Sequence, residues 1–312
     1  MIFSFYLLLF NSCSLILNFK DLPNPKGNYI IGTDVFTWED SYRDEWFTKD
    51  KIDTRKIVVQ IWYPASAKSD SLYPYMDHAE LRIQSIADRI EKGKGFIKPV
   101  SDVKGNSYYK AKPIKEKFPL ILFSHGLGGY KTQNLINVEA LVSQGYVVVA
   151  PDHTYDATIT IFEDGTSIGF EAGLPDDVTE DEFWNIRIPQ INTRASDISF
   201  IIDKLQTMKD YSLYSSIDFN KIGIFGHSFG GGTGIVASYL DNRISSCLNL
   251  DGWLEPVPEE IINNGLNIPF CYIGQIQENW GSANYNNEKL KEFHKNNNNS
   301  SYIFEVKDTK HM

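Results

Sequence analysis

The chain is 312 residues long, a length that suits one α/β enzyme domain and does not require two. Hydrophobic residues make up 42% of the chain and aromatic residues 13%, which is enough for a large buried core. The formal net charge is −10, and Lys and Arg form no basic stripe along the sequence. Because binding to nucleic acid needs clustered positive charge, the composition excludes nucleic acid as an expected partner.

The chain opens with an uncharged, apolar stretch between residues 2 and 19. Its densest part, Phe3 to Phe10, has the length of the apolar segment of a signal peptide and is too short to span a bilayer. We therefore expect residues 1–19 to be a signal peptide or lipoprotein leader, and the protein to be exported, either secreted or lipid-anchored through Cys13. An uncleaved anchor and a buried first element are the alternatives, since Asn11 is unusual before a lipidated cysteine and no basic residue precedes the apolar run.

Residues 22–312 are predicted to form a single domain that begins with two β-strands, 27–38 and 56–63, the second ended by Pro64. From residue 118 onward, short apolar runs alternate with longer amphipathic segments. This alternation is typical of βαβ crossovers and predicts a mostly parallel sheet behind an antiparallel start. The predicted strands of this part are 119–123, 146–150, 222–225, 244–250, 268–273 and 302–306. The predicted helices are 78–95, 133–144, 191–208 and 287–295.

Two long segments do not fit a minimal sheet. The segment 154–189 is rich in acidic and aromatic residues and is predicted to be an excursion from the sheet. The predicted helix 78–95 is partly amphipathic, so it either packs on the sheet or offers an apolar rim to a lipid surface. Loops of this length after sheet strands usually carry substrate selectivity.

The pentapeptide Gly226-His227-Ser228-Phe229-Gly230 follows a short apolar run and precedes a run of small residues. A strand, a tight turn and a helix in this order form a nucleophile elbow, the turn that presents the reactive serine of a hydrolase. The flanking glycines favour that turn, because a Cβ at either position would collide with the neighbouring strand or helix. An ordinary glycine-rich loop is the alternative. We expect Ser228 to be a nucleophile, which needs a nearby base and backbone donors for the oxyanion.

A carboxylate and an imidazole must meet this serine from later strand ends. Asp251 follows the predicted strand 244–250 and is the expected acid, with Glu278 after the next strand as its rival. An ordinary aspartate at a strand end is the other interpretation of Asp251. Among six histidines, only His311 follows the last predicted strand, so it is the expected base. His153, at another strand end, is the alternative base.

Two backbone N–H groups are expected to form the oxyanion hole. One belongs to Phe229, which follows the nucleophile. The other is assigned to Leu127, in the loop Ser124-His125-Gly126-Leu127-Gly128-Gly129, whose glycines let the backbone approach a substrate oxygen. A phosphate-binding loop is the alternative, but the Lys-Ser/Thr of a P-loop and the glycine spacing of a dinucleotide-binding turn are missing.

Several motifs resemble those of the plasma-type platelet-activating-factor acetylhydrolases, a family of the α/β-hydrolase superfamily. They are FSHGLGG at 123–129, GHSFGG at 226–231, LDGW at 250–253, QIWYP at 60–64 and Pro151 to His153. The resemblance covers most of the chain after about Leu22. It implies the α/β-hydrolase fold, with a mostly parallel central sheet, an antiparallel N-terminal start and helices on both faces.

The resemblance also implies a reaction, the hydrolysis of a carboxylic ester through an acyl-enzyme. Ser228 would be the nucleophile, Asp251 the acid and His311 the base, with Leu127 and Phe229 as oxyanion donors, and no metal or cofactor is implied. The expected substrate is a phospholipid with a short or oxidised sn-2 acyl group, met at a membrane or lipoprotein surface. A generic exported carboxylesterase or polyester hydrolase is the alternative enzyme, and a catalytically silent binding domain is the alternative without activity.

The end of the chain departs from the family pattern. In the family a further segment follows the histidine, whereas only Met312 follows His311 here. Either the chain is truncated, or the expected base lies on a chain end that can fray, and its orientation toward Asp251 then depends on an unanchored end.

Overall fold

A computed structural model gives the fold of the chain and describes residues 21–50, 52–89, 98–171, 174, 177–275, 283–309 and 311. The predicted leader, residues 1–19 with Cys13, lies outside the described residues, and so does Glu278. Among the described residues, no helix is both long and apolar enough to cross a bilayer.

The strands follow the predicted order along the chain. Among the additional short strands, β3 and β4 lie at the edge of the sheet, and β7 and β8 lie outside it. In the described part of the chain they are β1 (Ile30–Asp44), β2 (Thr54–Ala65), β3 (Leu72–Pro74), β4 (Lys104–Tyr109), β5 (Phe118–Ser124), β6 (Val147–Asp152), β7 (Ile159–Ile161), β8 (Ser167–Gly169), β9 (Ile217–His227), β10 (Ile244–Leu250), β11 (Phe270–Gly274) and β12 (Ser301–Glu305).

One large sheet organises the described residues, with the strand order β12-β11-β10-β9-β5-β6-β2-β1-β4-β3, while β7 and β8 form a separate ribbon. The strands from β12 to β6 are parallel to one another. Strand β2 pairs antiparallel with both β6 and β1. The prediction of a mostly parallel sheet with an antiparallel start is therefore confirmed.

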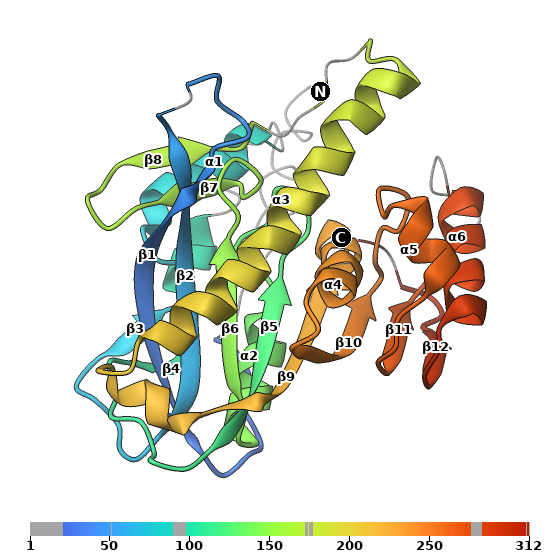
Figure 1. Cartoon of the computed structure of the whole chain (residues 1–312). Coiled ribbons are helices and arrows are strands. Elements are labelled where there is room, and N and C mark those ends of the chain that lie inside the picture. The colour runs from blue at the N-terminus through green and yellow to red at the C-terminus, as the bar shows by residue number, and fades with distance from the viewer. Residues whose placement is uncertain are drawn as a thin grey trace, which may run out of the picture.

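The helices pack on both faces of this sheet, as predicted. They are α1 (Ala79–Arg89), α2 (Leu135–Ser143), α3 (Glu180–Thr207), α4 (Phe229–Leu240), α5 (Glu259–Asn264) and α6 (Ala283–Asn296), with 3₁₀ turns η2 (Lys98–Asp102) and η3 (Ser212–Ser216). Figure 1 shows α3 and α4 crossing the near face of the sheet, with α2 behind it.

The two faces have separate cores. Apolar side chains of α3, α4, α5 and α6 share the larger core, in which Ile198 and Val236 are fully buried against strand residues such as Ile224. Helix α2 places Val138 and Val142 in a second core on the opposite face. Since burial of each such side chain contributes roughly 1.5–3 kcal/mol, these two layers hold the sheet and fix where its strands end.

Strand β2 differs from the prediction at Pro64, which does not end it. The strand continues to Ala65, and Pro64 pairs with Ile31 of β1. The pairing of β2 with β6 ends at Trp62, before Pro64. Pro64 therefore has no strand beside it on that side, and its missing N–H costs no hydrogen bond there. The Pro64 carbonyl accepts a hydrogen bond from the backbone of Ile114 at 3.0 Å.

Helix α3 begins well before the predicted start at Ile191, so the excursion 154–189 is shorter than expected. Thr179 caps the helix, because its hydroxyl accepts from the Glu182 N–H at 3.3 Å while the Glu182 carboxylate accepts from the Thr179 N–H at 2.9 Å. This reciprocal capping box satisfies two otherwise unpaired N–H groups. The helix then continues through Pro189, a residue that normally favours a break.

Helix α1 ends its described part at Arg89, whereas the predicted helix reached residue 95, and residues 90–97 lie outside the described residues. Ile83 and Ala87 pack with Met76 and Val100 in a small buried cluster. This contact favours the packed interpretation of the helix over a lipid rim.

Candidate active site

Ser228 occupies a tight turn between β9 and α4, with backbone angles φ 55° and ψ −122°. Such a positive φ is rare for a residue with a side chain. Two glycines permit the turn, since a Cβ on Gly226 would lie 2.0 Å from the Gly230 carbonyl oxygen. A Cβ on Gly230 would lie equally close, at 2.0 Å, to the carbonyl oxygen of Ser124. The predicted strand-turn-helix elbow is therefore present.

Parallel pairing of β9 and β10 places Asp251 beside this turn. Leu250 lies opposite His227 in the register, so the residues that follow them leave the sheet together. The Ser228 N–H donates to the Leu250 carbonyl at 3.1 Å, and the Trp253 N–H donates to the Ser228 carbonyl at 2.9 Å. These bonds fix the two strand ends relative to each other.

His311 completes a hydrogen-bonded series with these two residues. Its Nε2 lies 2.9 Å from Ser228 Oγ, and its Nδ1 lies 2.7 Å from Asp251 Oδ2. A carboxylate only accepts hydrogen bonds, so Nδ1 carries a proton and donates it to Asp251. Nε2 can then accept the Ser228 hydroxyl proton, which is the arrangement that a general base requires.

Asp251 has further partners that the sequence did not reveal. Its Oδ1 accepts from the Tyr272 hydroxyl and from the Gln275 N–H, each at 3.0 Å, and its Oδ2 accepts from Gln275 Nε2 at 3.0 Å. Burial opposes ionisation, but the hydrogen bonds from His311 and the Gln275 backbone hold the pKa of the Asp251 carboxyl below its ordinary value. The group is therefore a fixed anion at neutral pH.

In the loop after β5, the N–H groups of the three glycines are engaged in hydrogen bonds. The Gly126 N–H donates to Gln133 Oε1 at 2.8 Å, the Gly128 N–H to the Asp156 carbonyl at 2.7 Å, and the Gly129 N–H to the Gly126 carbonyl at 2.9 Å. Within the described residues, the N–H of Leu127 has no such partner.

Phe229 offers a second free donor. It is the first residue of α4, a position where a backbone N–H has no partner within the helix. The two expected oxyanion donors thus belong to chain segments that meet where Gly230 packs against Ser124.

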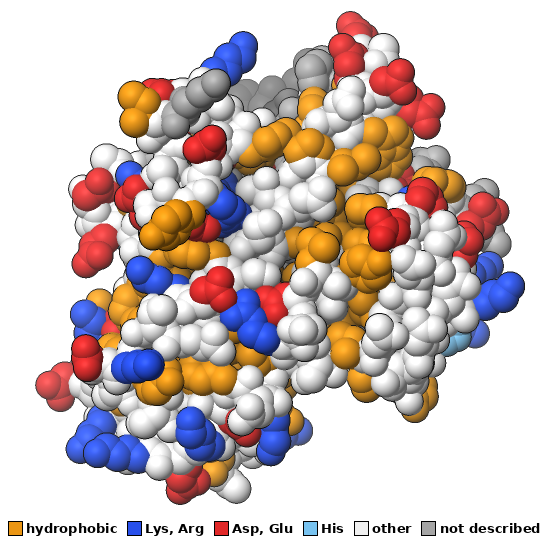
Figure 2. Space-filling model, viewed as in Figure 1, with side chains coloured by type: hydrophobic (Ala, Val, Ile, Leu, Met, Phe, Trp, Pro, Cys, Tyr) orange, Lys and Arg blue, Asp and Glu red, His pale blue; other side chains and the backbone are white. Residues whose placement is uncertain are grey.

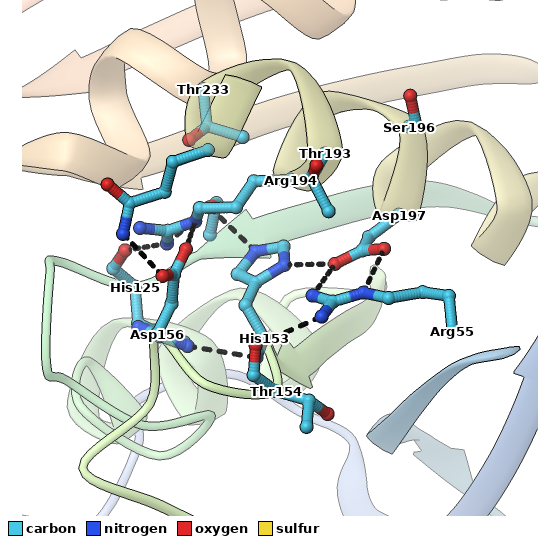
Figure 3. Close-up of polar contacts among 12 residues, drawn as sticks. Arg55, His125, His153, Thr154, Asp156, Thr193, Arg194, Ser196, Asp197 and Thr233 are labelled. Atoms are coloured by element: carbon cyan, nitrogen blue, oxygen red, sulfur yellow. Dashed lines mark hydrogen bonds and ion pairs between the residues drawn. The ribbon is translucent and has the colours of Figure 1, made fainter. Parts of the chain in front are cut away.

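The alternative base, His153, lies in a different hydrogen-bond network. It is fully buried, and its ring bonds to Ser124 and Asp197. Figure 3 shows this ring pointing toward Asp197, and Arg55 donates to the same carboxylate oxygen, Oδ2. His227, inside the elbow, stacks on His311 with ring centroids 5.0 Å apart.

The sheet order and the serine turn after β9 are those of the α/β-hydrolase fold. The family model described as "Platelet-activating factor acetylhydrolase, isoform II" matches residues 17–312, and the chain belongs to this family. The resemblance noted in the motifs is therefore confirmed.

Three known proteins illustrate the relationship. Platelet-activating factor acetylhydrolase from Bos taurus is 32% identical over 167 residues, covering 47% of this chain and 37% of the bovine protein. A probable 1-alkyl-2-acetylglycerophosphocholine esterase from Arthroderma benhamiae is 24% identical over 259 residues, covering 78% of this chain and 61% of the fungal protein. The match thus spans less than two thirds of either relative. A ferulic acid esterase from Streptomyces cinnamoneus has the same fold, with a TM-score of 0.78, 23% identity and coverage of 94% of this chain and 78% of that one.

Proposed function

We propose that this chain is a serine esterase that hydrolyses the short or oxidised sn-2 acyl group of phospholipids. The observation that carries the proposal is the hydrogen-bonded series Ser228, His311 and Asp251, whose members follow three different strands. The family supports the substrate class, and the fungal relative is named as a probable esterase of 1-alkyl-2-acetylglycerophosphocholine.

In the first half of the proposed reaction, Ser228 Oγ attacks the ester carbonyl carbon while His311 Nε2 takes the hydroxyl proton. The resulting oxyanion accepts hydrogen bonds from the N–H groups of Leu127 and Phe229. The bond from the carbonyl carbon to the lysophospholipid oxygen then breaks, and His311 returns its proton to that oxygen. The lysophospholipid leaves, and the acyl group stays on Ser228.

In the second half, a water attacks the acyl-enzyme and His311 takes one of its protons. The same two backbone donors stabilise the second oxyanion, and the carboxylic acid leaves as Ser228 recovers its proton. Removing one such donor typically costs about 3 kcal/mol of transition-state stabilisation, so the loop of Leu127 matters as much as a catalytic side chain. Asp251 holds the imidazole in the tautomer that both halves require.

An aromatic cluster beside the oxyanion donors supports a lipid substrate. The Trp253 ring lies 5.6 Å from the Phe229 ring and 6.0 Å from the Phe183 ring, and the Arg187 guanidinium lies over Phe183 at 5.5 Å. Hydrophobic side chains also gather along the N-terminal half of α3 (Figure 2), where Ile188 is 40% exposed. We propose that this surface faces the membrane or lipoprotein from which the substrate comes.

We further propose that the protein is exported. The support is the uncharged apolar stretch between residues 2 and 19, which has the length of a signal-peptide segment. Cys13 is the candidate for a lipid anchor. Mass spectrometry of the mature N-terminus tests both proposals, because cleavage before Cys13 with an added diacylglyceryl group supports the anchor, and an intact Met1 contradicts export with cleavage.

The substrate assignment is tested by comparing two esters. We expect a short-chain sn-2 phospholipid to be turned over with a higher kcat/KM than a simple water-soluble ester, and Ser228→Ala to lower both rates by on the order of 10⁵-fold or more. A strong preference for the simple ester would favour a generic carboxylesterase or polyester hydrolase. No hydrolysis of either ester by the wild-type chain would favour a silent binding domain.

A further inference from the structure

A second Ser-His-Asp series lies buried inside the molecule and shares no residue with the series at Ser228. Ser124 ends β5, His153 follows β6 and Asp197 lies on α3. Ser124 Oγ is 3.0 Å from His153 Nε2, and His153 Nδ1 is 2.8 Å from Asp197 Oδ2. All three side chains have 0% exposure, so no ester can reach this serine. The series must therefore serve something other than nucleophilic attack.

The hydrogen bonds of this series have a fixed direction. Burial opposes ionisation of Asp197, but the Arg55 guanidinium holds the pKa of that carboxyl well below its ordinary value. Asp197 is thus an acceptor, and His153 Nδ1 donates to it. Burial together with the nearby Arg194 cation lowers the pKa of His153 to about 3, so the ring is neutral and its Nε2 accepts from the Ser124 hydroxyl.

Arg194 connects this series to the loop that carries Leu127. Its Nη2 donates to Ser124 Oγ at 3.1 Å and also to the carbonyl of His125. Its guanidinium carbon lies 4.9 Å from the centre of the Phe229 ring, the side chain of the other expected oxyanion residue. Figure 3 shows Arg194 between the ring of His153 and the chain at His125. One buried cation therefore touches both segments of the expected oxyanion hole.

His125 then orients the next peptide. Its Nδ1 lies 2.6 Å from the Gly126 carbonyl oxygen, and its Nε2 accepts from the His153 N–H at 3.2 Å, so Nδ1 is the donor. In a trans peptide the carbonyl of one residue and the N–H of the next point in opposite directions. Because the Gly126 carbonyl is held toward the His125 ring, the N–H of Leu127 is held facing the other way.

We propose that Arg194 and His125 are positioning residues that fix the peptide between Gly126 and Leu127, so that the Leu127 N–H faces the substrate oxyanion. The buried series Ser124, His153 and Asp197 keeps the hydrogen-bond partners of Arg194 in place. This inference rests on the proposed esterase function. None of these residues touches the reacting atoms, so their effect is expected in kcat rather than in KM.

Two variants and a matched control test this role. Arg194→Met keeps much of the side-chain volume but removes the donors, and Ser124→Ala removes one hydroxyl while leaving the contact of Arg194 with His125. Ser216→Ala is the control. Ser216 is equally buried, ends η3 just before β9, and its hydroxyl bonds to the Ile114 carbonyl, outside this network. We measure kcat, KM, the melting temperature and the inhibition constant of a trifluoromethyl ketone, which forms an oxyanion on the reactive serine.

We expect Arg194→Met to lower kcat about 100-fold, as loss of one oxyanion donor does, and to raise the inhibition constant of the ketone in proportion while KM changes little. Ser124→Ala is expected to lower kcat about fivefold, the effect of one buried hydrogen bond. Arg194→Lys, which keeps the charge and one donor, should recover part of the loss. Ser216→Ala should lower the melting temperature only.

The proposal is overturned if the variants lower the melting temperature but leave kcat and the inhibition constant at wild-type values. If Arg194→Met does not fold, Ser124→Ala decides alone, and an unchanged kcat in that variant overturns the role. Failure of the proposed esterase function gives a different result, because the wild-type chain would then hydrolyse no ester, or Ser228→Ala would hydrolyse it as fast as the wild type.

Discussion

Two residues of the proposed triad have backbone conformations that are unusual for residues with side chains. The φ angles are 55° at Ser228 and 47° at Asp251. Each such conformation costs on the order of 1–3 kcal/mol and persists only where the surroundings enforce it. Two hydrogen bonds hold these conformations: the Ser228 N–H donates to the Leu250 carbonyl, and the Asp251 N–H donates to the Ile273 carbonyl. In these conformations the Ser228 and Asp251 side chains both reach the imidazole of His311.

The substitution Asp251→Asn tests the role of the acid. An amide can donate to His311 Nδ1 and so stabilises the wrong tautomer, which removes the acceptor for the Ser228 proton. We expect kcat to fall by about 10⁴-fold, with an unchanged melting temperature within a few degrees. Steady-state kinetics and thermal unfolding check the two parts. Should Glu278→Gln abolish turnover while Asp251→Asn does not, the assignment of the acid is wrong.

The roles of single residues were predictable from the sequence where the residue follows a predicted strand. They were not predictable where the role depends on a tertiary contact. Ser228, Asp251 and His311 each follow a predicted strand, and the structure brings all three together. Tyr272 reaches Asp251 only because β11 lies beside β10. Arg194 belongs to a helix whose apolar stripe is visible in the sequence, but nothing local shows that its guanidinium is buried.

Helix α4 joins the serine turn to the sheet, and its glycines have unequal roles. A Cβ on Gly230 would lie 2.0 Å from the Ser124 carbonyl oxygen, whereas a Cβ on Gly234 would meet Cys247 Sγ at 3.6 Å, an ordinary contact. Close approach of the helix to β5 therefore depends on Gly230. Gly234 has no such constraint, although it lies in the same helix.

The pair Gly230→Ala and Gly234→Ala tests this difference. Gly230→Ala is expected to push α4 from β5, lowering both the free energy of unfolding and kcat. Gly234→Ala should raise the free energy of unfolding by about 0.5–1 kcal/mol, because alanine loses less backbone entropy in a helix, with kcat unchanged. Urea unfolding of both variants measures the free energy of unfolding, and steady-state kinetics measures kcat. Equal effects of the two substitutions would contradict the packing account.

The existence of the strands was easier to predict from the sequence than the point where a helix begins. The apolar runs of β6 and of the second half of β9 are buried on both faces of the sheet, whereas β5 and β10 also have half-buried or exposed residues. All four runs are apolar enough for their sequences to identify them as strands. The start of α3 depends instead on the capping box at Thr179, which lies in a polar stretch and precedes Pro189. The predicted excursion ended at residue 189, whereas the capping box starts the helix earlier and the helix continues through Pro189.

Across the whole molecule, buried histidines are expected to make stability depend on pH. Burial lowers the pKa of His125 well below its ordinary value of 6.5, that of His153 to about 3 and that of His227 to about 4. The folded state keeps these rings neutral, while the unfolded chain takes up protons on them as the pH falls through about 6.5. Asp156 acts in the opposite direction, because burial raises its pKa to about 6 and it binds a proton in the folded state.

The net difference near pH 5 is roughly two protons in favour of the unfolded chain, so the free energy of unfolding should fall by roughly 2–3 kcal/mol per pH unit there. Urea unfolding between pH 7 and pH 5 measures this slope. A free energy of unfolding that stays constant or rises over this interval would contradict the neutral state of the three rings.

The sheet order explains how residues far apart in the chain meet. Ser228 follows β9, Asp251 follows β10 and His311 follows β12, and these parallel strands leave the sheet at the same edge. The same edge carries Ser124 at the end of β5 and His153 after β6, which form the buried series together with Asp197 of α3. Two Ser-His-Asp arrangements thus lie in the described part of the chain; the buried one is closed to solvent, and solvent reaches the side chains of the one at Ser228.

Covalent labelling separates these two serines most directly. The wild-type chain is treated with a fluorophosphonate, which modifies serines that a nearby base activates, and the adduct is located by peptide mass spectrometry. We expect one equivalent of label on the peptide that contains Ser228, no label on the peptide that contains Ser124, and loss of all labelling in Ser228→Ala. An adduct on Ser124, or no adduct on Ser228 in the active protein, would contradict the proposed catalytic site.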